Sequence, residues 1–246
     1  MSTFRKDYLS VENEVALHSE LAQAPAHAEP PPAPPSPDGG AGYYGSVEFE
    51  PGSPTARQKF RELMAAENAK HSWGSILLLT LLSGVVGGVF AVPGVFLSGG
   101  GSAWQIVALT IFGPFTEETL KQSGMLFQLE KLPGSVRHDW QFFVAGALGG
   151  MVFAVLENLV YQHVYLRHMP PDKLAAVMAF RWSVCVAVHI GCTMISALGL
   201  RRVWRDGMEA GEPCQIAKAF PWFMAAMAVH GGYNLFVWLF NDRIFG

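Results

Sequence analysis

Residues 103–129 read AWQIVALTIFGPFTEETLKQSGMLFQL, an apolar stretch interrupted by Gly113-Pro114 and by the charged group Glu117, Glu118 and Lys121. A helix needs roughly 20 residues to cross a hydrocarbon core about 30 Å thick, and this stretch has 27. Further stretches of similar length and polarity lie near 74–97, 141–166, 175–200 and 216–240. The sequence therefore predicts an all-α fold, a polytopic membrane helix bundle of about five transmembrane helices within a membrane-embedded domain, 72–246.

The composition separates the chain into two parts. Of its 246 residues 50% are apolar and 15% charged, with a net charge of −3, which argues against a nucleic-acid binder that relies on a basic surface. Residues 1–71 hold 10 of the 20 acidic residues, and nine of the 16 prolines fall between Pro25 and Pro54. Proline-rich runs favour extended backbone over helix or strand. Residues 1–71 are therefore predicted to be a disordered cytoplasmic tail, with a short juxtamembrane helix between Arg57 and Lys70.

Basic residues near the ends of the predicted spans indicate their orientation. Nine lie on the side of the tail and of the loops 130–140 and 201–215, whereas three, Arg167, Lys173 and Arg243, lie on the opposite side. The chain is therefore expected in the cell membrane, with its N-terminus in the cytoplasm and its C-terminus outside.

Polar residues inside the spans are the candidates for function. The charged ones are Glu117, Glu118, Lys121, Glu157, Arg181 and Lys218. A charge at the centre of a membrane helix costs about 2.5–3.5 kcal/mol, so each is a functional-site hypothesis. At the helical rise, Glu117 lies roughly 1.5 Å, Glu157 roughly 5 Å, and His189 and His230 roughly 2–3 Å from mid-membrane. Four successive helices are thus expected to form one polar cluster inside the bundle.

Some of these charges have simpler explanations. Lys121 follows Glu118 by three residues and Glu117 by four, which is the spacing of an intrahelical ion pair. One lysine neutralises one carboxylate, so the second glutamate stays unexplained. Arg181 and Lys218 lie nearer the ends of their spans and are expected to snorkel to the interface.

Pro114 predicts a break in the helix just before the glutamates. Proline has no backbone N–H, so the carbonyl of Thr110 is expected to lack its partner and the helix to kink. A new helical segment would then begin near Glu117 and Glu118, where the positive end of the helix dipole favours carboxylates.

The chemistry of the cluster suits hydrolysis. Glutamate and histidine can activate water, and Asn234, one turn after His230, can stabilise a developing oxyanion. Alternatively, Glu118, Glu157, His189 and His230 offer ligands that zinc accepts, and a divalent metal would then activate the water. The pattern of residues leaves both mechanisms open.

The motifs, taken in order, resemble those of a known family. Glu117-Glu118-x-x-Lys121, Phe153-x-x-x-Glu157-Asn158, His189 and His230-x-x-x-Asn234 look like the motifs of PrsW-type intramembrane proteases. That family is related to the type II CAAX prenyl endopeptidases and the bacteriocin-processing proteins. The resemblance covers about 103–240. CAAX-type relatives carry histidine where this chain has Glu157, which favours the PrsW branch.

The resemblance implies an enzyme and assigns its residues. It implies an intramembrane endopeptidase that cleaves membrane-anchored proteins, such as an anti-sigma-factor-like protein, with Glu117 or Glu118 as the general base. Glu157, His189 and His230 would hold the water or a metal, and Asn234 would stabilise the oxyanion. Lys121, Asn158 and Thr193 are expected to support them.

Two other classes of function remain open on the sequence. Mid-membrane glutamates and histidines also form proton relays and ion sites, so an ion- or proton-coupled transporter or channel is the main alternative. A catalytically silent scaffold that binds membrane segments is the other.

Overall fold

The computed structural model describes residues 54–97 and 104–245, with side chains up to residue 240. These residues form helices and no strands, as the sequence predicts. Residues 1–53 of the predicted disordered tail lie outside the described part. Helix α2 (Pro54–Ala69) covers the segment for which a short juxtamembrane helix is predicted.

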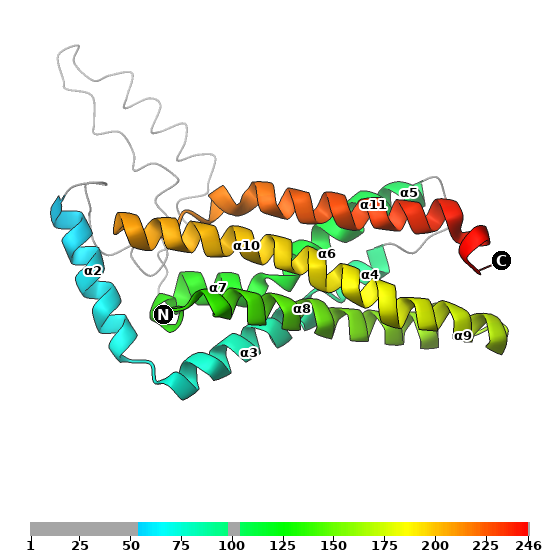
Figure 1. The fold of residues 1–246 in the computed structure, drawn as a ribbon, viewed down its shortest axis with the longest axis horizontal. Coiled ribbons are helices and arrows are strands. Elements are labelled where there is room, and N and C mark those ends of the chain that lie inside the picture. The colour runs from blue at the N-terminus through cyan, green and yellow to red at the C-terminus, as the bar shows by residue number, and fades with distance from the viewer. Residues whose placement is uncertain (1–53, 98–103, 246) are drawn as a thin grey trace, which may run out of the picture. The chain divides into compact units, whose positions relative to one another are not determined.

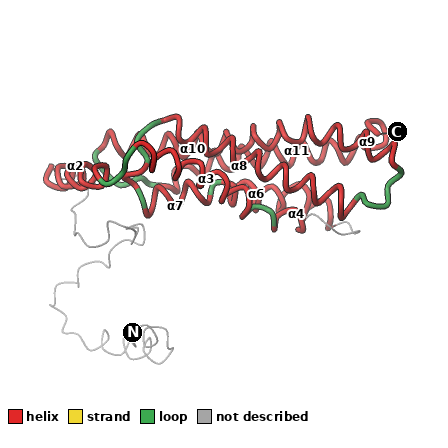
Figure 2. The backbone as a smooth tube through the Cα atoms, turned by 90° about the horizontal axis from the view of Figure 1, so that it is seen from below, coloured by secondary structure: helices red, strands yellow, loops and turns green. Residues whose placement is uncertain are grey.

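The described helices follow one another with few loops. After α2 come α3 (Trp73–Phe90), α4 (Pro93–Leu97), α5 (Trp104–Val107), the π-helix η2 (Ala108–Phe112), α6 (Gly113–Lys121), α7 (Ser123–Lys131) and the 3-10 helix η3 (Pro133–Ser135). Then come α8 (Asp139–Val160), the π-helix η4 (Tyr161–Tyr165), α9 (Pro171–Phe180), the π-helix η5 (Arg181–Cys185), α10 (Val186–Ala210), η6 (Ile216–Ala219) and α11 (Phe220–Phe245). In Figure 1 and Figure 2 the helices α3, α8, α10 and α11 run alongside one another.

Four of the five predicted spans are long apolar helices in the described part of the chain. They are Trp73–Leu97, Asp139–Tyr165, Pro171–Ala210 and Ile216–Phe240. The remaining span, 103–129, is a series of shorter helices, α5, η2, α6 and α7, which change register just before Pro114. The break predicted at the proline is therefore present, as a π-helix followed by a new α-helix.

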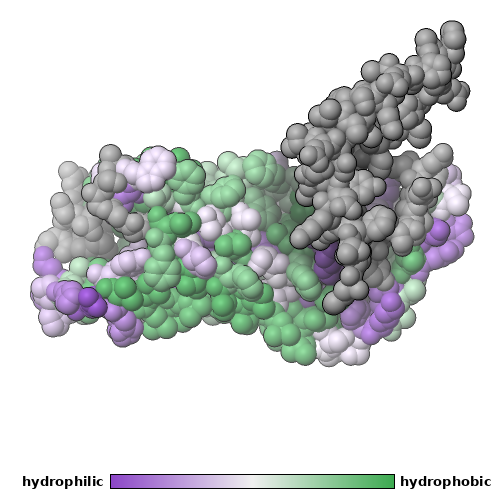
Figure 3. Space-filling model, turned by 180° about the vertical axis from the view of Figure 1, so that it is seen from behind, coloured by the Kyte–Doolittle hydropathy of each residue, from purple (hydrophilic) through white to green (hydrophobic). Residues whose placement is uncertain are grey.

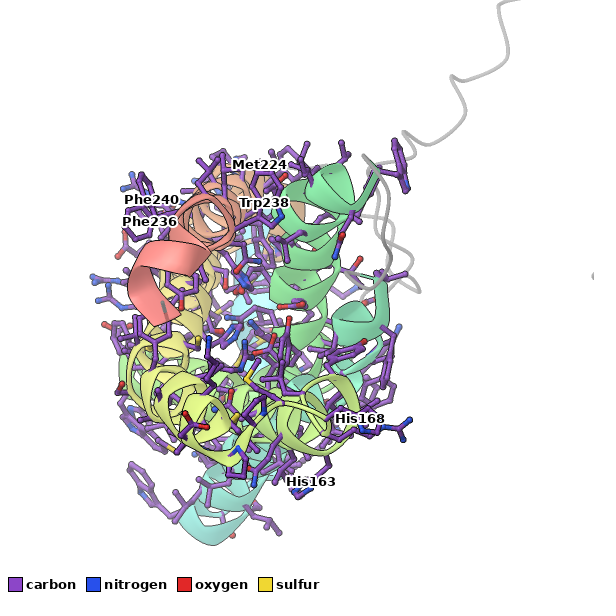
Figure 4. The ribbon with its side chains drawn as sticks, turned by 90° about the vertical axis from the view of Figure 1, so that its right-hand side faces the viewer. His163, His168, Met224, Phe236, Trp238 and Phe240 are labelled. Carbon is purple, nitrogen blue, oxygen red and sulfur yellow. The ribbon has the colours of Figure 1, made fainter. Side chains whose placement is uncertain are left out.

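The outer surface of the bundle is apolar, as lipid requires. Large apolar side chains such as Leu78, Phe90 and Phe236 are about half exposed. On the face drawn in Figure 3, apolar surface covers the middle and polar surface gathers toward the two ends. Figure 4 looks along the helices and shows Met224, Phe236 and Trp238 around α11, with nitrogen and oxygen atoms gathered between the helices.

Glycines let the helices approach closely. A Cβ on Gly84 of α3 would come within 2.8 Å of the Ala145 carbonyl oxygen of α8, and one on Gly88 within 2.7 Å of the Gly149 carbonyl. On another part of α8, a Cβ on Gly150 would lie 2.8 Å from the Cα of Ile190 on α10. These small-residue contacts, typical of membrane helices, hold α8 against both neighbours and fix the rotation of its polar residues.

Two apolar clusters lie along the bundle. The larger includes Met125, Phe142, Leu200 and Phe223, and the smaller consists of Ala91, Val95 and Phe153, all buried. The buried ionisable side chains of α6, α8, α10 and α11 are the polar part of this interior.

Candidate functional site

The predicted polar cluster exists and is buried. Glu117 and Glu118 of α6, Glu157 of α8, His189 of α10 and His230 of α11 are each no more than 8% exposed. Their helices bring them together from distant parts of the chain; Glu118 and His230, for example, are 112 residues apart. The expectation that four successive helices turn their polar residues inward is therefore confirmed.

Lys121 is part of this cluster rather than only a partner within its own helix. Its Nζ lies 2.7 Å from Glu118 Oε1 and 3.9 Å from Glu117 Oε2, as the intrahelical spacing predicts. The same ammonium donates to His189 Nδ1 at 3.1 Å and lies 4.1 Å from the centre of the Phe153 ring. Lys121 therefore links α6 to α8 and α10.

The two histidines each pair with a carboxylate. His189 Nε2 lies 2.8 Å from Glu157 Oε2, and His230 Nδ1 lies 2.8 Å from Glu118 Oε1. Because an ammonium only donates, Nδ1 of His189 accepts from Lys121 and Nε2 carries the proton. His230 donates from Nδ1 to Glu118, which leaves its Nε2 with a lone pair, 3.7 Å from Glu117 Oε2.

Arg181 does not snorkel to the interface, contrary to the prediction. Its Nη2 donates to Glu157 Oε2 at 2.7 Å and its Nε to Asn158 Oδ1 at 3.0 Å. Its guanidinium also lies 3.4 Å from the centre of the Tyr161 ring, and the side chain is 12% exposed. A buried carboxylate left without a cation is strongly destabilising. Arg181 therefore turns inward and completes the Glu157 end of the site.

Asn234 occupies a position set by the broken helix. Its Nδ2 donates to the carbonyl of Leu109 at 3.0 Å. Gly113 N–H pairs with Ala108 in the π register, so the next donor in that register belongs to Pro114, which has none. In this register the carbonyl that loses its partner to the proline is that of Leu109, and Asn234 satisfies it. The prediction named Thr110 because it assumed an α register.

Two further residues, Thr193 and Gln122, donate to backbone carbonyls of α10 beside the cluster. Thr193 Oγ1 donates to the His189 carbonyl at 2.7 Å and lies 3.5 Å from Glu118 Oε2. Gln122, which the sequence analysis did not identify, donates to the Thr193 carbonyl at 2.8 Å and to Ser196 Oγ at 2.9 Å. Its position, one residue after Lys121, was the only signal in the sequence.

A small polar cavity of about 30 Å³ opens against this network. It is lined by Val95, Leu109, Glu117, Glu157, Tyr161, Arg181, Cys185, His189, Tyr233 and Asn234. A cavity of this size with several polar walls can hold water. Glu117 lines it and its Oε2 makes no hydrogen bond. Glu118 does not line it and is bonded to both Lys121 and His230.

Each of the three π-helices contributes to the cavity wall. Leu109 comes from η2, Tyr161 from η4, and Arg181 and Cys185 from η5. Such π-helical segments are rare and occur frequently at functional sites. They shift the side chains that follow by part of a turn, and here they lie one or two turns from Glu117, Glu157 and His189.

The donor set fits a divalent metal. One oxygen or nitrogen from each of Glu117, Glu118, His189 and His230 lies within 4.8 Å of the others. Each histidine donates an N–H to a carboxylate, as metal-binding histidines do. The other nitrogen of His230 keeps its lone pair, whereas that of His189 accepts from Lys121, so a metal on His189 would replace this bond. Three carboxylates face the two cations Lys121 and Arg181, so one negative charge remains for a proton or a bound cation. Glu157, also a predicted ligand, lies outside this set and orients His189 instead.

The sequence pointed to four of the ten residues that line the cavity, Glu117, Glu157, His189 and Asn234. Tyr161, Cys185 and Tyr233 were not candidates, and Arg181 was expected at the interface. A signal for Arg181 was available in the charge balance, because Lys121 alone leaves two of the three buried glutamates without a cation. The Cys185 Sγ and Tyr233 Oη, 2.9 Å apart, had no such signal.

The chain was compared with known families, curated proteins and solved structures. A family model described as PrsW family intramembrane metalloprotease matches residues 71–245. No curated protein and no solved structure matches the chain.

Proposed function

Because this chain belongs to the PrsW family of intramembrane metalloproteases, we propose that it hydrolyses peptide bonds of membrane-anchored proteins with Glu117 as the general base. The observation that carries this assignment is the position of Glu117. Its carboxylate lines the polar cavity with one oxygen that makes no hydrogen bond, whereas Glu118 is held by Lys121 and His230. A base needs a free lone pair beside the water that it activates.

The proposed reaction begins with a water molecule in the cavity. Glu117 takes one proton as the water oxygen bonds to the carbonyl carbon of the substrate, and the electron pair of the carbonyl double bond moves onto its oxygen. When the carbon–nitrogen bond breaks, the oxyanion becomes a carboxyl group and Glu117 returns the proton to the leaving amine. The other buried residues hold the geometry of these steps.

Asn234 is proposed to stabilise the oxyanion. One amide hydrogen of Nδ2 is bonded to Leu109, and the second remains for the substrate. The bond to Leu109 fixes the amide beside the cavity before substrate arrives, which is how a donor contributes most to the rate.

The family description implies a metal, and the residues to hold it are present. Glu118, His189 and His230 would form a set of one carboxylate and two imidazoles, as in catalytic zinc sites. A metal bound there supplies a Lewis acid that lowers the pKa of water and polarises the carbonyl. Glu157 would keep His189 oriented, and Glu117 would keep its role as base.

The orientation is proposed from the charges at one end of the bundle. Arg137 donates to the His71 carbonyl, and Arg201 bonds to Asp139, so the basic loops gather where α2 meets the bundle. An excess of arginine and lysine marks the cytoplasmic side. We therefore propose a cytoplasmic N-terminus, with single-span proteins that enter from the bilayer as substrates.

The test is reconstitution in liposomes with a panel of single-span membrane proteins. We expect cleavage by the wild type and none by Glu117→Gln, with Glu62→Gln on the exposed face of α2 as a control of equal charge change. If cleavage is absent from all three while proton or ion flux depends on Glu118, the protease assignment is wrong and the transporter alternative takes its place. Cleavage that persists in Glu117→Gln would refute the base assignment alone.

A further inference from the structure

Arg181, which lines the cavity, has hydrogen-bond donors that its partners in the chain do not use. Arg181 carries five N–H groups on three nitrogens. Nε is bonded to Asn158 and Nη2 to Glu157, and Nη1 makes no hydrogen bond with the described residues. The side chain lines the same cavity as Glu117 and Asn234. Donors therefore remain on the cavity wall for a group that is not part of the chain.

The guanidinium is held rigidly in this position. Glu157 and Asn158 accept from its edge, and the ring of Tyr161 covers its face at 3.4 Å. A cation fixed in a buried site interacts with nearby negative charge far more strongly than one in water. Preorganised donors of this kind stabilise charge that develops during a reaction, because little reorganisation is needed.

Two other polar residues of the cavity wall already have partners. Both ring nitrogens of His189 have partners, Lys121 and Glu157, and Tyr233 is paired with Cys185. Asn234 has one amide hydrogen left after its bond to Leu109. Oxyanion sites in acyl transfer commonly combine two donors, and Arg181 is the cavity residue that carries both free N–H groups and a positive charge.

We propose that Arg181 is a catalytic residue of the protease reaction, which donates an N–H to the carbonyl oxygen of the scissile bond and stabilises the oxyanion together with Asn234. This inference rests on the proposed function. When water adds to the carbonyl carbon, the electron pair that moves onto oxygen comes to lie against the guanidinium. The alternative is that Arg181 only neutralises Glu157.

The two roles predict different results for Arg181→Lys. Lysine keeps a positive charge beside Glu157, so the protein is expected to stay folded. Its single ammonium replaces the guanidinium, so the N–H donor proposed for the oxyanion is lost. We expect kcat to fall on the order of 10²-fold, as for the loss of an oxyanion donor, with KM changed less than about twofold and Tm close to that of wild type. The control is Arg167→Gln, which removes an arginine that contacts His168 and does not line the cavity. A stable Arg181→Lys protein with wild-type kcat overturns the proposal.

A comparison of two variants that both lack the Glu157 carboxylate decides the matter if Arg181→Lys does not fold. Glu157→Gln is compared with the double variant Glu157→Gln/Arg181→Gln by single-turnover cleavage of the panel substrate that wild type cuts best. We expect the double variant to be slower by on the order of 10²-fold. Equal rates would mean that Arg181 serves only Glu157. Glu117→Gln measured alongside separates the failures, because cleavage independent of Glu117 refutes the proposed function, whereas cleavage that needs Glu117 but not Arg181 refutes only this inference.

Discussion

Replacement of Gly150 by alanine tests whether the contact between α8 and α10 sets the geometry of the site. A Cβ at this position would lie 2.8 Å from the Ile190 Cα, 2.9 Å from the His189 carbonyl oxygen and 3.0 Å from the Ile190 nitrogen. All three atoms belong to backbone, which cannot rotate away. Ordinary contact begins at 3.4 Å, so the two helices must separate by about 0.6 Å.

This separation acts directly on the pair that orients His189. Glu157 is on the same helix as Gly150, and its bond to His189 Nε2 is 2.8 Å long, so a shift of 0.6 Å stretches it to about 3.4 Å. Overpacking costs about 1–3 kcal/mol and the weakened bond to a charged group about 1 kcal/mol, while alanine regains about 1 kcal/mol of helix propensity. The net loss of about 1–3 kcal/mol corresponds to a fall in Tm of roughly 2–12 °C.

The control is Gly191→Ala on the adjoining turn of α10, where an added Cβ meets no atom within 4 Å. Thermal unfolding in detergent and cleavage of a panel substrate are measured for both variants. We expect Gly150→Ala to melt lower and cleave at least about tenfold more slowly, because misplacement by about 1 Å costs about 10²-fold in rate. Gly191→Ala should match wild type or be slightly more stable. Equal Tm and equal cleavage for the two variants would refute the reasoning.

Three other outcomes follow from the structure. Gly231→Ala places a Cβ inside the contact distance of the Thr110 carbonyl oxygen, so it should lower Tm and cleavage, whereas Gly232→Ala, with no atom within 4 Å, should do neither; equal behaviour contradicts the packing of α11 on η2. Burial raises the pKa of the Cys214 thiol to about 11, so maleimide should label it far more slowly at pH 8 than in unfolded protein, as followed by mass spectrometry of its peptide. The raised pKa favours the protonated thiol in the folded state, so its contribution to the free energy of unfolding is lost as pH rises from about 9 to about 11. Elemental analysis of protein purified without chelators should find about one divalent metal ion per chain and severalfold less in His230→Ala; full cleavage after exhaustive chelation would leave a mechanism based on glutamate alone.

The sequence predicted the depth of the polar residues in the membrane better than it predicted which residues they contact. Glu117, Glu157 and His189 were placed near mid-membrane by counting along each helix, and they do meet. The same counting gave Arg181 a position nearer the end of its span, from which it was expected to reach the interface. Its actual partner, Glu157, is 24 residues away on another helix, and no local pattern connects the two.

At Pro114, too, one feature could be predicted from the sequence and another depends on the packing of the helices. The missing donor could be predicted from one residue, because proline lacks an N–H in any context. Which carbonyl stays unpaired depends on whether the preceding turn is α or π, and that register is set by the packing of η2 against α11. The partner that satisfies Leu109, Asn234, is 125 residues further along the chain.

The amino-acid sequence is sufficient to predict a helical membrane protein with a few charged and imidazole side chains at one depth. Those features depend on free energies that are local to each helix, namely transfer of apolar residues into lipid and the fixed rise per residue. The sequence is not sufficient to predict that Glu117 faces a cavity while Glu118 is held by Lys121 and His230, or that Arg181 turns inward. These outcomes depend on how each helix is rotated against its neighbours, which is set by close contacts such as Gly150 on Ile190 between residues far apart in the chain.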